Sequence, residues 1–446
     1  MHALLKDIAA ISPVRRFGRV SRIEGLMIEI TGAAGAISLG GQVRLTSSSG
    51  KEIRCEVVGF RDGRAQVMPL GALDGMTLGA RADFDDSPAV IHPTTAWLGR
   101  VVDGFGNPAD GKGPLPHGPE AYPLKANPPP AASRGRVGAK LDLGVRAMNA
   151  FTTLCEGQRM GIFAGSGVGK STLMAMLARN SNADAIVIAL VGERGREVKE
   201  FIEDDLGEDG LARSVVVAAT SDEPPLVRRQ AAYVAMAIAE QLRDQGLNVL
   251  MLMDSVTRFA MAQREVGLSA GEPPASKGYT PTVFAELPRL LERAGPGPHG
   301  RPGSITGLFT VLVEGDDHNE PVADAVRGIL DGHIVLERNI AERGRFPAIN
   351  ILKSVSRAMP GCNSEEEQAL VLRARSPLAT YEDMAELIRL GAYKAGTNAE
   401  VDMAIKVYPA LEAFLSQKKD ERTAFTECYA GLEKILGSVP GKGNGS

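Results

Sequence analysis

The stretch AGSGVGKST, Ala164–Thr172, decides the fold of this chain. It follows the apolar run MGIF and precedes LMAMLAR, a run of residues that favours a helix. Glycines between a strand and a helix let the backbone wrap a phosphate with its N–H groups inward, and the N-terminus of the helix adds its positive end. The stretch therefore predicts a phosphate-binding loop (P-loop), with Ala164 in place of the first glycine of the strict motif.

The P-loop is expected to hold both nucleotide and metal. Lys170 would reach the β- and γ-phosphates, and the hydroxyl group of Ser171 would bind Mg²⁺. A glycine-rich turn with an incidental lysine is the alternative, but it does not explain why strand, helix and Lys-Ser pair are all in register. The residues expected to bind nucleotide here are Gly165, Ser166, Gly167, Val168, Gly169, Lys170, Ser171 and Thr172.

Apolar runs and helical stretches alternate around this loop. Near-continuous apolar runs are typical of strands that are covered on both faces. Their alternation with helices predicts a mostly parallel α/β sheet, which we assign to a nucleotide-binding domain of residues 91–375. The runs are MGIFAG, AIVIALVG, SVVVAAT, NVLMLMD and SITGLFTVLVEG.

The flanking regions have different patterns. Short Val-, Ile- and Leu-rich runs punctuated by Gly and Ser predict a small closed β-barrel within residues 1–90. Residues 376–446 carry helical patterns only, and Thr380 with Asp383 resembles a capping box that would begin the first of these helices. Within residues 1–15, HALLKDIAAI predicts a helix with one apolar face. That helix would either dock on a regulatory partner or the membrane surface, or pack on the chain's own barrel.

Two carboxylates follow apolar strands on the C-terminal side of the loop. Asp254 ends NVLMLMD, and such an aspartate usually holds a water of the Mg²⁺ shell beside a P-loop. Glu193 follows AIVIALVG and so lies at the same edge of the sheet as Lys170. A carboxylate there can orient and polarise the attacking water. The spacing alone equally allows a surface helix start with mixed charges at Glu193.

Composition excludes several classes of protein. The 446 residues are 44% hydrophobic and 23% charged, which fits a soluble globular protein of two or three domains. A net charge of −4 gives no electrostatic case for a nucleic-acid partner. Four scattered cysteines without a CxxC pair argue against a zinc site or a disulfide framework and favour a reducing cytosol. No run is long and apolar enough to cross a bilayer, so we expect a cytoplasmic protein.

Four motifs together resemble the ATP synthase superfamily of rotary ATPases. They are AGSGVGKST, GERGRE, the strand ending in Asp254 followed by SVTRF, and PAINILKSVS, in the order and spacing of that family. The resemblance covers nearly the whole chain. It implies three domains: an N-terminal β-barrel, a central α/β nucleotide-binding domain and a C-terminal helical domain.

The resemblance also implies a role for single residues. Lys170 and Ser171 match the phosphate and Mg²⁺ residues, and Glu193 matches the catalytic glutamate. The remaining matches are Arg194 and Glu197, which link the γ-phosphate to metal waters; Asp254, the strand aspartate, and Arg258 near the phosphates; Phe346, which stacks on adenine; and Arg357, the arginine finger that enters the neighbouring subunit's site.

The presence of Glu193 and Arg357 on one chain bears on assembly. In the F-type ATP synthase, the catalytic subunit carries the glutamate and the non-catalytic subunit carries the finger. A chain with both can complete its sites only against copies of itself, so a homohexamer is expected. This pair of residues also argues against the alternative of a structural ring subunit that binds nucleotide without hydrolysing it.

Within the superfamily, several segments resemble the ATPases of protein export. SDEPPLVRRQAAYVAMAIAEQLRDQG and FTVLVEGDDHNEPVADAVRGILDGHIVLER favour the flagellar export machine, and the ATPase of a virulence type III secretion system is the alternative. The resemblance implies that the partners are regulatory and stalk proteins, an export gate at the inner membrane, and export substrates with their chaperones. The acidic balance disfavours a third alternative, a nucleic-acid translocase.

Overall fold

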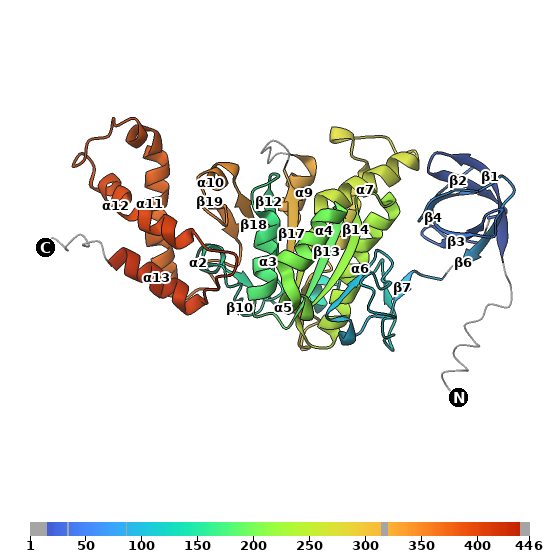
Figure 1. Ribbon diagram of the computed structural model, residues 1–446, viewed down its shortest axis with the longest axis horizontal. Coiled ribbons are helices and arrows are strands. Elements are labelled where there is room, and N and C mark those ends of the chain that lie inside the picture. Colours follow the sequence, from blue (N-terminus) through green and yellow to red (C-terminus); the bar gives the residue numbers. More distant parts are fainter. Residues whose placement is uncertain (1–15, 34, 86, 314–319, 438–446) are drawn as a thin grey trace.

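The computed structural model describes residues 16–33, 35–85, 87–313 and 320–437. Three regions follow one another along its longest axis: a barrel, a central sheet with helices on both faces, and a helical C-terminal region (Figure 1). This order confirms the predicted fold class. The helix predicted within residues 1–15 lies outside the described residues.

The N-terminal barrel closes on itself because its first and last strands pair with each other. The strand order is β1-β2-β5-β4-β3-β6, and β1 pairs antiparallel with β6. Alternate residues such as Val43 and Leu45 point into a core of their own, which is separate from the core of the sheet. The strands are β1 (Phe17–Glu24), β2 (Met27–Thr31), β3 (Gln42–Thr46), β4 (Glu52–Arg61), β5 (Arg64–Pro69) and β6 (Arg81–Asp85).

The central sheet has the order β19-β18-β12-β17-β15-β13-β14-β8, with β16 (Gly295–Pro296) paired to β17. The strands from β18 to β8 are parallel, and β19 joins the edge antiparallel to β18. The ranges along this order are β19 (Ile349–Ser356), β18 (Gly332–Leu336), β12 (Arg159–Ala164), β17 (Ser304–Leu312), β15 (Asn248–Asp254), β13 (Ala185–Glu193), β14 (Ser214–Thr220) and β8 (Arg100–Val102).

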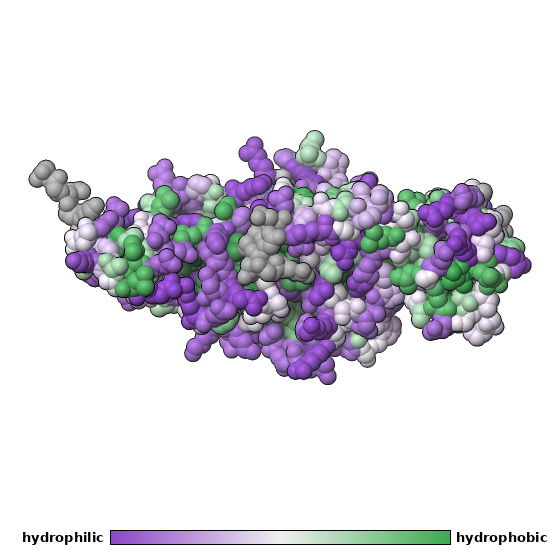
Figure 2. Space-filling view, turned by 90° about the horizontal axis from the view of Figure 1, so that it is seen from above, coloured by the Kyte–Doolittle hydropathy of each residue, from purple (hydrophilic) through white to green (hydrophobic). Residues whose placement is uncertain are grey.

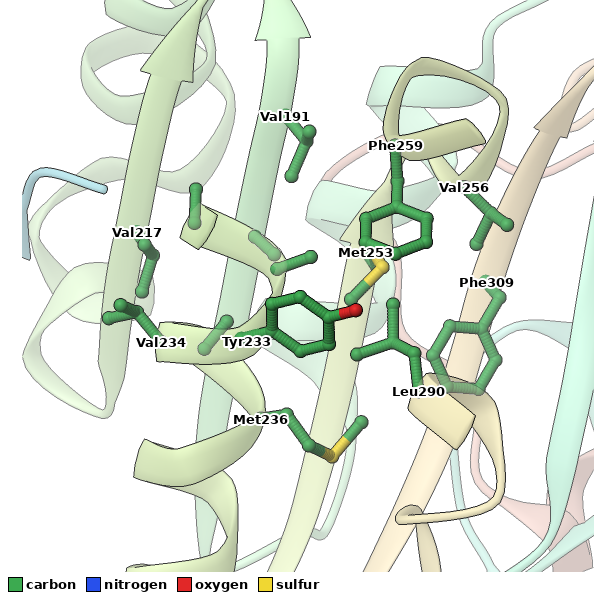
Figure 3. Packing of buried hydrophobic residues seen from close by; sticks show 14 of the residues in the cluster. Val191, Val217, Tyr233, Val234, Met236, Met253, Val256, Phe259, Leu290 and Phe309 are labelled. Atoms are coloured by element: carbon green, nitrogen blue, oxygen red, sulfur yellow. The ribbon is translucent and has the colours of Figure 1, made fainter. Parts of the chain in front are cut away.

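Helices bury both faces of this sheet, as the apolar runs predict. In β13, Val187 and Ala189 belong to the core under α6 (Pro225–Asp244) and α7 (Val256–Ser269). The intervening Ile188 and Leu190 belong to the core under α3 (Lys170–Asn180) on the opposite face. Figure 3 shows the first of these cores, where Tyr233 of α6 lies edge-on to Phe259 of α7. Burial on both faces fixes the register of the strands and hence the positions of the residues at their ends.

The C-terminal region consists of α11 (Glu365–Arg389), α12 (Ala399–Leu415) and α13 (Phe425–Gly437). The capping-box prediction at Thr380 and Asp383 is wrong, because Thr380 lies inside α11. The capping box is formed instead by Ser364 and Glu367, whose side chains bond reciprocally to the backbone at the start of the helix. The helix α11 continues through Pro377, although proline usually interrupts a helix, and therefore begins well before Thr380. The predicted domain boundary at 375/376 falls within α11, and we propose Asn363 instead.

Candidate active site

The P-loop joins β12 to α3, in the strand–loop–helix context that its sequence predicts. Gly169 ends the loop in a left-handed conformation, with φ of +88°, directly before the first helical residue, Lys170. A side chain at this position would be strained, and its Cβ would lie 3.3 Å from the ring of Phe346. Glycine therefore brings the loop against an aromatic ring while it opens the helix N-terminus toward a phosphate.

Lys170 joins the two predicted carboxylates at one point. Its Nζ bonds to Oδ1 of Asp254 and lies 3.8 Å from Oε1 of Glu193. The three residues come from the ends of three separate elements, α3, β15 and β13, which the parallel sheet brings to one edge. The two carboxylates offset the charge of the lysine.

A residue of the neighbouring strand fixes the side chain of Asp254. It is buried, and the Thr310 hydroxyl group on the neighbouring strand β17 donates a hydrogen bond of 2.8 Å to its Oδ1. Thr310 was not identified in the sequence, because a threonine inside an apolar strand carries no motif. Its hydroxyl group fixes the orientation of the carboxylate, whose other side-chain partner among the described residues is Lys170.

Glu193 has the electrostatics of a group that can exchange a proton near neutral pH. Burial raises its pKa to about 7, and the neighbouring Asp254 charge acts in the same direction, whereas Lys170 and Arg258 oppose the rise. Its Oε1 is buried without a hydrogen-bond partner among the described residues. A carboxylate with an unused oxygen and this pKa can accept a proton from water.

A cleft of about 690 Å³ opens above these groups. Arg194 and Glu197, which form an ion pair of 3.2 Å at the start of α4 (Gly195–Glu200), lie on its rim. Arg258 approaches from α7 and packs against Gly192, where an added Cβ would lie 3.1 Å from the Cβ of Arg258. The predicted residues that line the cleft are Gly165, Ser166, Gly167, Gly169, Lys170, Ser171, Thr172, Glu193, Arg194, Glu197 and Arg258.

Three predicted nucleotide-binding residues do not line this cleft. The Val168 side chain is buried in the core, so only its backbone can face a phosphate. Asp254 is buried and bonds to Lys170, which itself lines the cleft. Phe346 is half-exposed and borders an adjoining cavity of about 450 Å³, which it shares with Gly169 and Thr172 of the P-loop. A flat aromatic side chain beside the loop suits the stacking of a nucleobase.

Arg338 also lines the cleft and was missed in the sequence. Its guanidinium group donates a hydrogen bond of 3.2 Å to the Ser166 carbonyl oxygen, at the tip of the P-loop. It comes from the start of α10 (Arg338–Glu342), after strand β18. Only the fold places this arginine beside the loop, since its sequence neighbours LERNI carry no phosphate-binding pattern.

Arg357 lies at the opposite end of the sheet from the P-loop. It follows β19, is exposed, and its backbone N–H bonds to the Asp331 carbonyl oxygen, ahead of β18. The P-loop follows Ala164, which is paired with Leu336 at the other end of β18. Five residues of strand separate Asp331 from Leu336, a distance of about 16 Å. The Arg357 side chain is therefore too far from the P-loop of its own chain to contact a phosphate bound there.

The donor set of the cleft fits a nucleotide with Mg²⁺. Backbone N–H groups and the cations Lys170, Arg258 and Arg338 suit phosphates. The Ser171 hydroxyl group supplies a hard oxygen ligand for Mg²⁺, and the carboxylates of Asp254 and Glu197 can accept hydrogen bonds from the waters that Mg²⁺ keeps. A P-loop with a buried strand aspartate and a glutamate poised near neutral pH defines the chain as a nucleotide-binding ATPase.

Comparison with known proteins agrees with this class. Residues 144–356 match the nucleotide-binding domain of the ATP synthase alpha/beta family, and residues 363–434 match the C-terminal domain of the type III secretion ATPase EscN. The chain belongs to the ATP synthase alpha/beta family. This membership confirms the resemblance stated from its motifs.

Individual relatives refine the position within the family. A flagellum-specific ATP synthase of Caulobacter vibrioides is 59% identical over 98% of this chain and 100% of that protein. A type 3 secretion system ATPase of Xanthomonas euvesicatoria is 47% identical over 98% of this chain and 97% of that protein. The assembled ATPase EscN of enteropathogenic E. coli has a TM-score of 0.86 at 40% identity, over 94% of this chain and 100% of that one. EscN has also been solved in complex with its central stalk EscO.

Proposed function

We propose that this chain hydrolyses Mg-ATP as a ring of six copies and thereby energises or prepares the export of flagellar proteins. One observation carries the proposal: Lys170, Asp254 and Glu193 meet at one point, whereas Arg357 is presented at the far end of the sheet. One chain thus carries most of its own hydrolytic site, and its Arg357 would complete the site of another copy.

The residues of the cleft divide the work of phosphoryl transfer. Lys170 exchanges Asp254 for the β- and γ-phosphates. Ser171, and Asp254 through water, would hold Mg²⁺, which would supply positive charge against the phosphates. Glu193 orients the attacking water and accepts its proton. Arg194 with Glu197 and Arg258 surround the γ-phosphate and the metal waters. Phe346 stacks on the base.

The surface of the barrel supports the ring. Large apolar side chains are exposed there, and Figure 2 shows apolar patches on the barrel end of the molecule. Exposed apolar groups of this kind mark protein contacts. These side chains are Phe17, Leu26, Leu39, Phe60 and Leu78. The assembled state of EscN supports the same proposal.

The same relatives support the proposed partners and location. The EscN–EscO complex supports a central stalk protein as a partner of this ring. Among the described residues, no helix is long and apolar enough to cross a membrane. We place the ring in the cytoplasm, attached peripherally to the export gate of the inner membrane, where it receives export substrates with their chaperones. The flagellar relatives favour the flagellar system over the virulence system.

Assembly and function can be tested together. Specific ATPase activity should rise with protein concentration as rings form, in parallel with the mass measured by light scattering. Full activity from a monomer at high dilution would contradict the ring. In cells, deletion of the gene should abolish flagellar filaments and motility, and the wild-type gene should restore both. Normal filaments in the deletion strain would favour the virulence system, and RNA-stimulated hydrolysis would favour a nucleic-acid translocase.

A further inference from the structure

Two cysteines that are far apart in the sequence meet beside the segment that carries Arg357. Cys155 lies in the short strand β11 (Leu154–Cys155), and Cys362 lies five residues after Arg357. Both are free, each thiol has the largest effect on the pKa of the other, and the segments that carry them are in direct contact. The remaining described cysteines, Cys55 and Cys428, are buried elsewhere, in the barrel and in the C-terminal region.

Neighbouring contacts hold the two segments together around this pair. The Ser356 hydroxyl group donates to the Thr153 carbonyl oxygen at 2.7 Å, and the Thr153 N–H donates to Sδ of Met359 at 3.2 Å. Lys140, the antiparallel partner of Cys155, forms an ion pair of 2.5 Å with Glu367 of the α11 capping box. The thiols thus lie where the sheet, the Arg357 segment and the first C-terminal helix converge.

The two thiols differ in the way that a reactive and a resolving cysteine differ. Cys362 is partly exposed, whereas Cys155 is buried. The hydrogen bond from Cys155 and the charge of Lys140 lower the pKa of Cys362 to about 7, against the effect of burial, and the pKa of Cys155 is raised. An accessible thiolate beside a second thiol is the arrangement of redox-sensing cysteines, and cytosolic disulfides are commonly transient and of this type.

We propose that Cys155 and Cys362 form a redox-sensitive pair, whose disulfide ties the Arg357 segment to β11 and slows hydrolysis. The effect on hydrolysis rests on the proposed function of Arg357, since a finger must adjust as the neighbouring site turns over. The disulfide would close a loop between residues 155 and 362 and would join the nucleotide-binding region to a residue just before Ser364, the N-cap of α11.

A peroxide is the oxidant class that an exposed thiolate meets first. The Cys362 thiolate attacks one peroxide oxygen, the O–O bond breaks, and the departing hydroxide takes a proton to become water. The Cys155 sulfur then attacks the sulfenic sulfur of Cys362, the S–O bond breaks, and the second hydroxide leaves with the Cys155 proton as water. Both sulfurs are oxidised and both peroxide oxygens are reduced. A small dithiol reverses the process.

The test uses the full chain, treated with hydrogen peroxide, alkylated and mapped by mass spectrometry without reduction. A Cys155–Cys362 linked peptide should appear, and hydrolysis should fall roughly tenfold or more, because an arginine finger contributes about three or more orders of magnitude. Dithiothreitol should restore the rate. Cys362→Ser should hydrolyse ATP normally and resist peroxide, and the matched variant Cys428→Ala should respond like the wild type.

Several outcomes would overturn the proposal: no linked peptide, linkage through other cysteines, or unchanged hydrolysis by fully linked protein. Cys155→Ala provides a second variant if Cys362→Ser folds poorly. The reduced wild-type chain separates this proposal from the proposed function. If it hydrolyses no ATP although rings form, the proposed function fails, whereas peptide mapping still decides whether the cysteine pair exists.

Discussion

The two ends of the central sheet differ in how their charged residues are arranged. At the C-terminal end of the parallel strands, Lys170, Asp254 and Glu193 lie within ion-pair distance, mostly buried and surrounded by cations. At the opposite end, Arg357 is exposed. The first end is organised by contacts within the chain, and we propose that the second acts only when another chain approaches it. One sheet can thus offer a site to one neighbour and an arginine to another.

The largest loss of hydrolysis is expected at the P-loop end of the sheet. Lys170→Ala removes the cation that holds the β- and γ-phosphates, so hydrolysis should be abolished and ATP binding weakened. Circular dichroism should show an intact fold, since the lysine side chain lines a cleft rather than a core. Near-normal phosphate release by a correctly folded variant would mean that the P-loop assignment is wrong.

The next effect tests the other end of the sheet. Arg357→Ala should lower hydrolysis by roughly three or more orders of magnitude, the contribution of an arginine finger, while each chain keeps its own nucleotide contacts. Binding of a fluorescent ATP analogue should therefore change little, and phosphate release should report the loss.

Mixing the two variants decides whether the arginine acts between chains. In mixed rings with Lys170→Ala protein, about a quarter of the interfaces pair an intact P-loop with an intact Arg357, so some activity should return. The control is Arg357→Ala mixed with a chain that carries both substitutions, which should recover nothing. Absence of rescue in rings proven to be mixed would contradict a finger that acts in trans.

The sequence predicted the local motifs of the site better than its long-range contacts, for a physical reason. A P-loop is a local motif, and strand-end residues such as Glu193 and Asp254 follow from the period and burial of the strands, so both could be placed without coordinates. Thr310 and Arg338 touch the site through pairings between distant strands, which leave no local pattern. The contact of Cys155 with Cys362 was hidden in the same way, because the two residues are joined only by the fold.

The start of α11 shows a second limit. Thr380 and Asp383 have the spacing of a capping box, but Ser364 and Glu367 have the same spacing. Ser364 also stands directly before three successive glutamates, Glu365–Glu367, which favour a helix N-terminus. Proline usually interrupts a helix, but Pro377 is buried inside the continuous helix α11. A local signal thus competed with an equally good one, and tertiary contacts decided between them.

The smallest effect concerns the proton at the first end of the sheet. Because burial and Asp254 raise the pKa of Glu193 to about 7, the free enzyme should lose its general base as the pH falls below about 7. The value of kcat/KM should then drop by about tenfold for each further pH unit. Glu193→Gln keeps the size of the side chain but cannot accept the proton, so turnover should fall by roughly two orders of magnitude, ATP should still bind, and this limb of the pH profile should disappear.

The same shift makes an opposite prediction for stability, which separates chemistry from folding. A carboxyl group whose pKa is higher in the folded than in the unfolded chain binds its proton more tightly when folded. Its contribution to the free energy of unfolding therefore declines as the pH rises from about 4.5 to about 7, the interval between the two pKa values. Urea unfolding of wild type and Glu193→Gln at pH 5 and pH 8 measures this difference. The variant should gain stability relative to wild type at pH 8, where the wild-type carboxylate is ionised, while its activity there stays low. If the variant instead lost stability at pH 8 and bound no ATP, Glu193 would serve structure or metal binding rather than proton transfer.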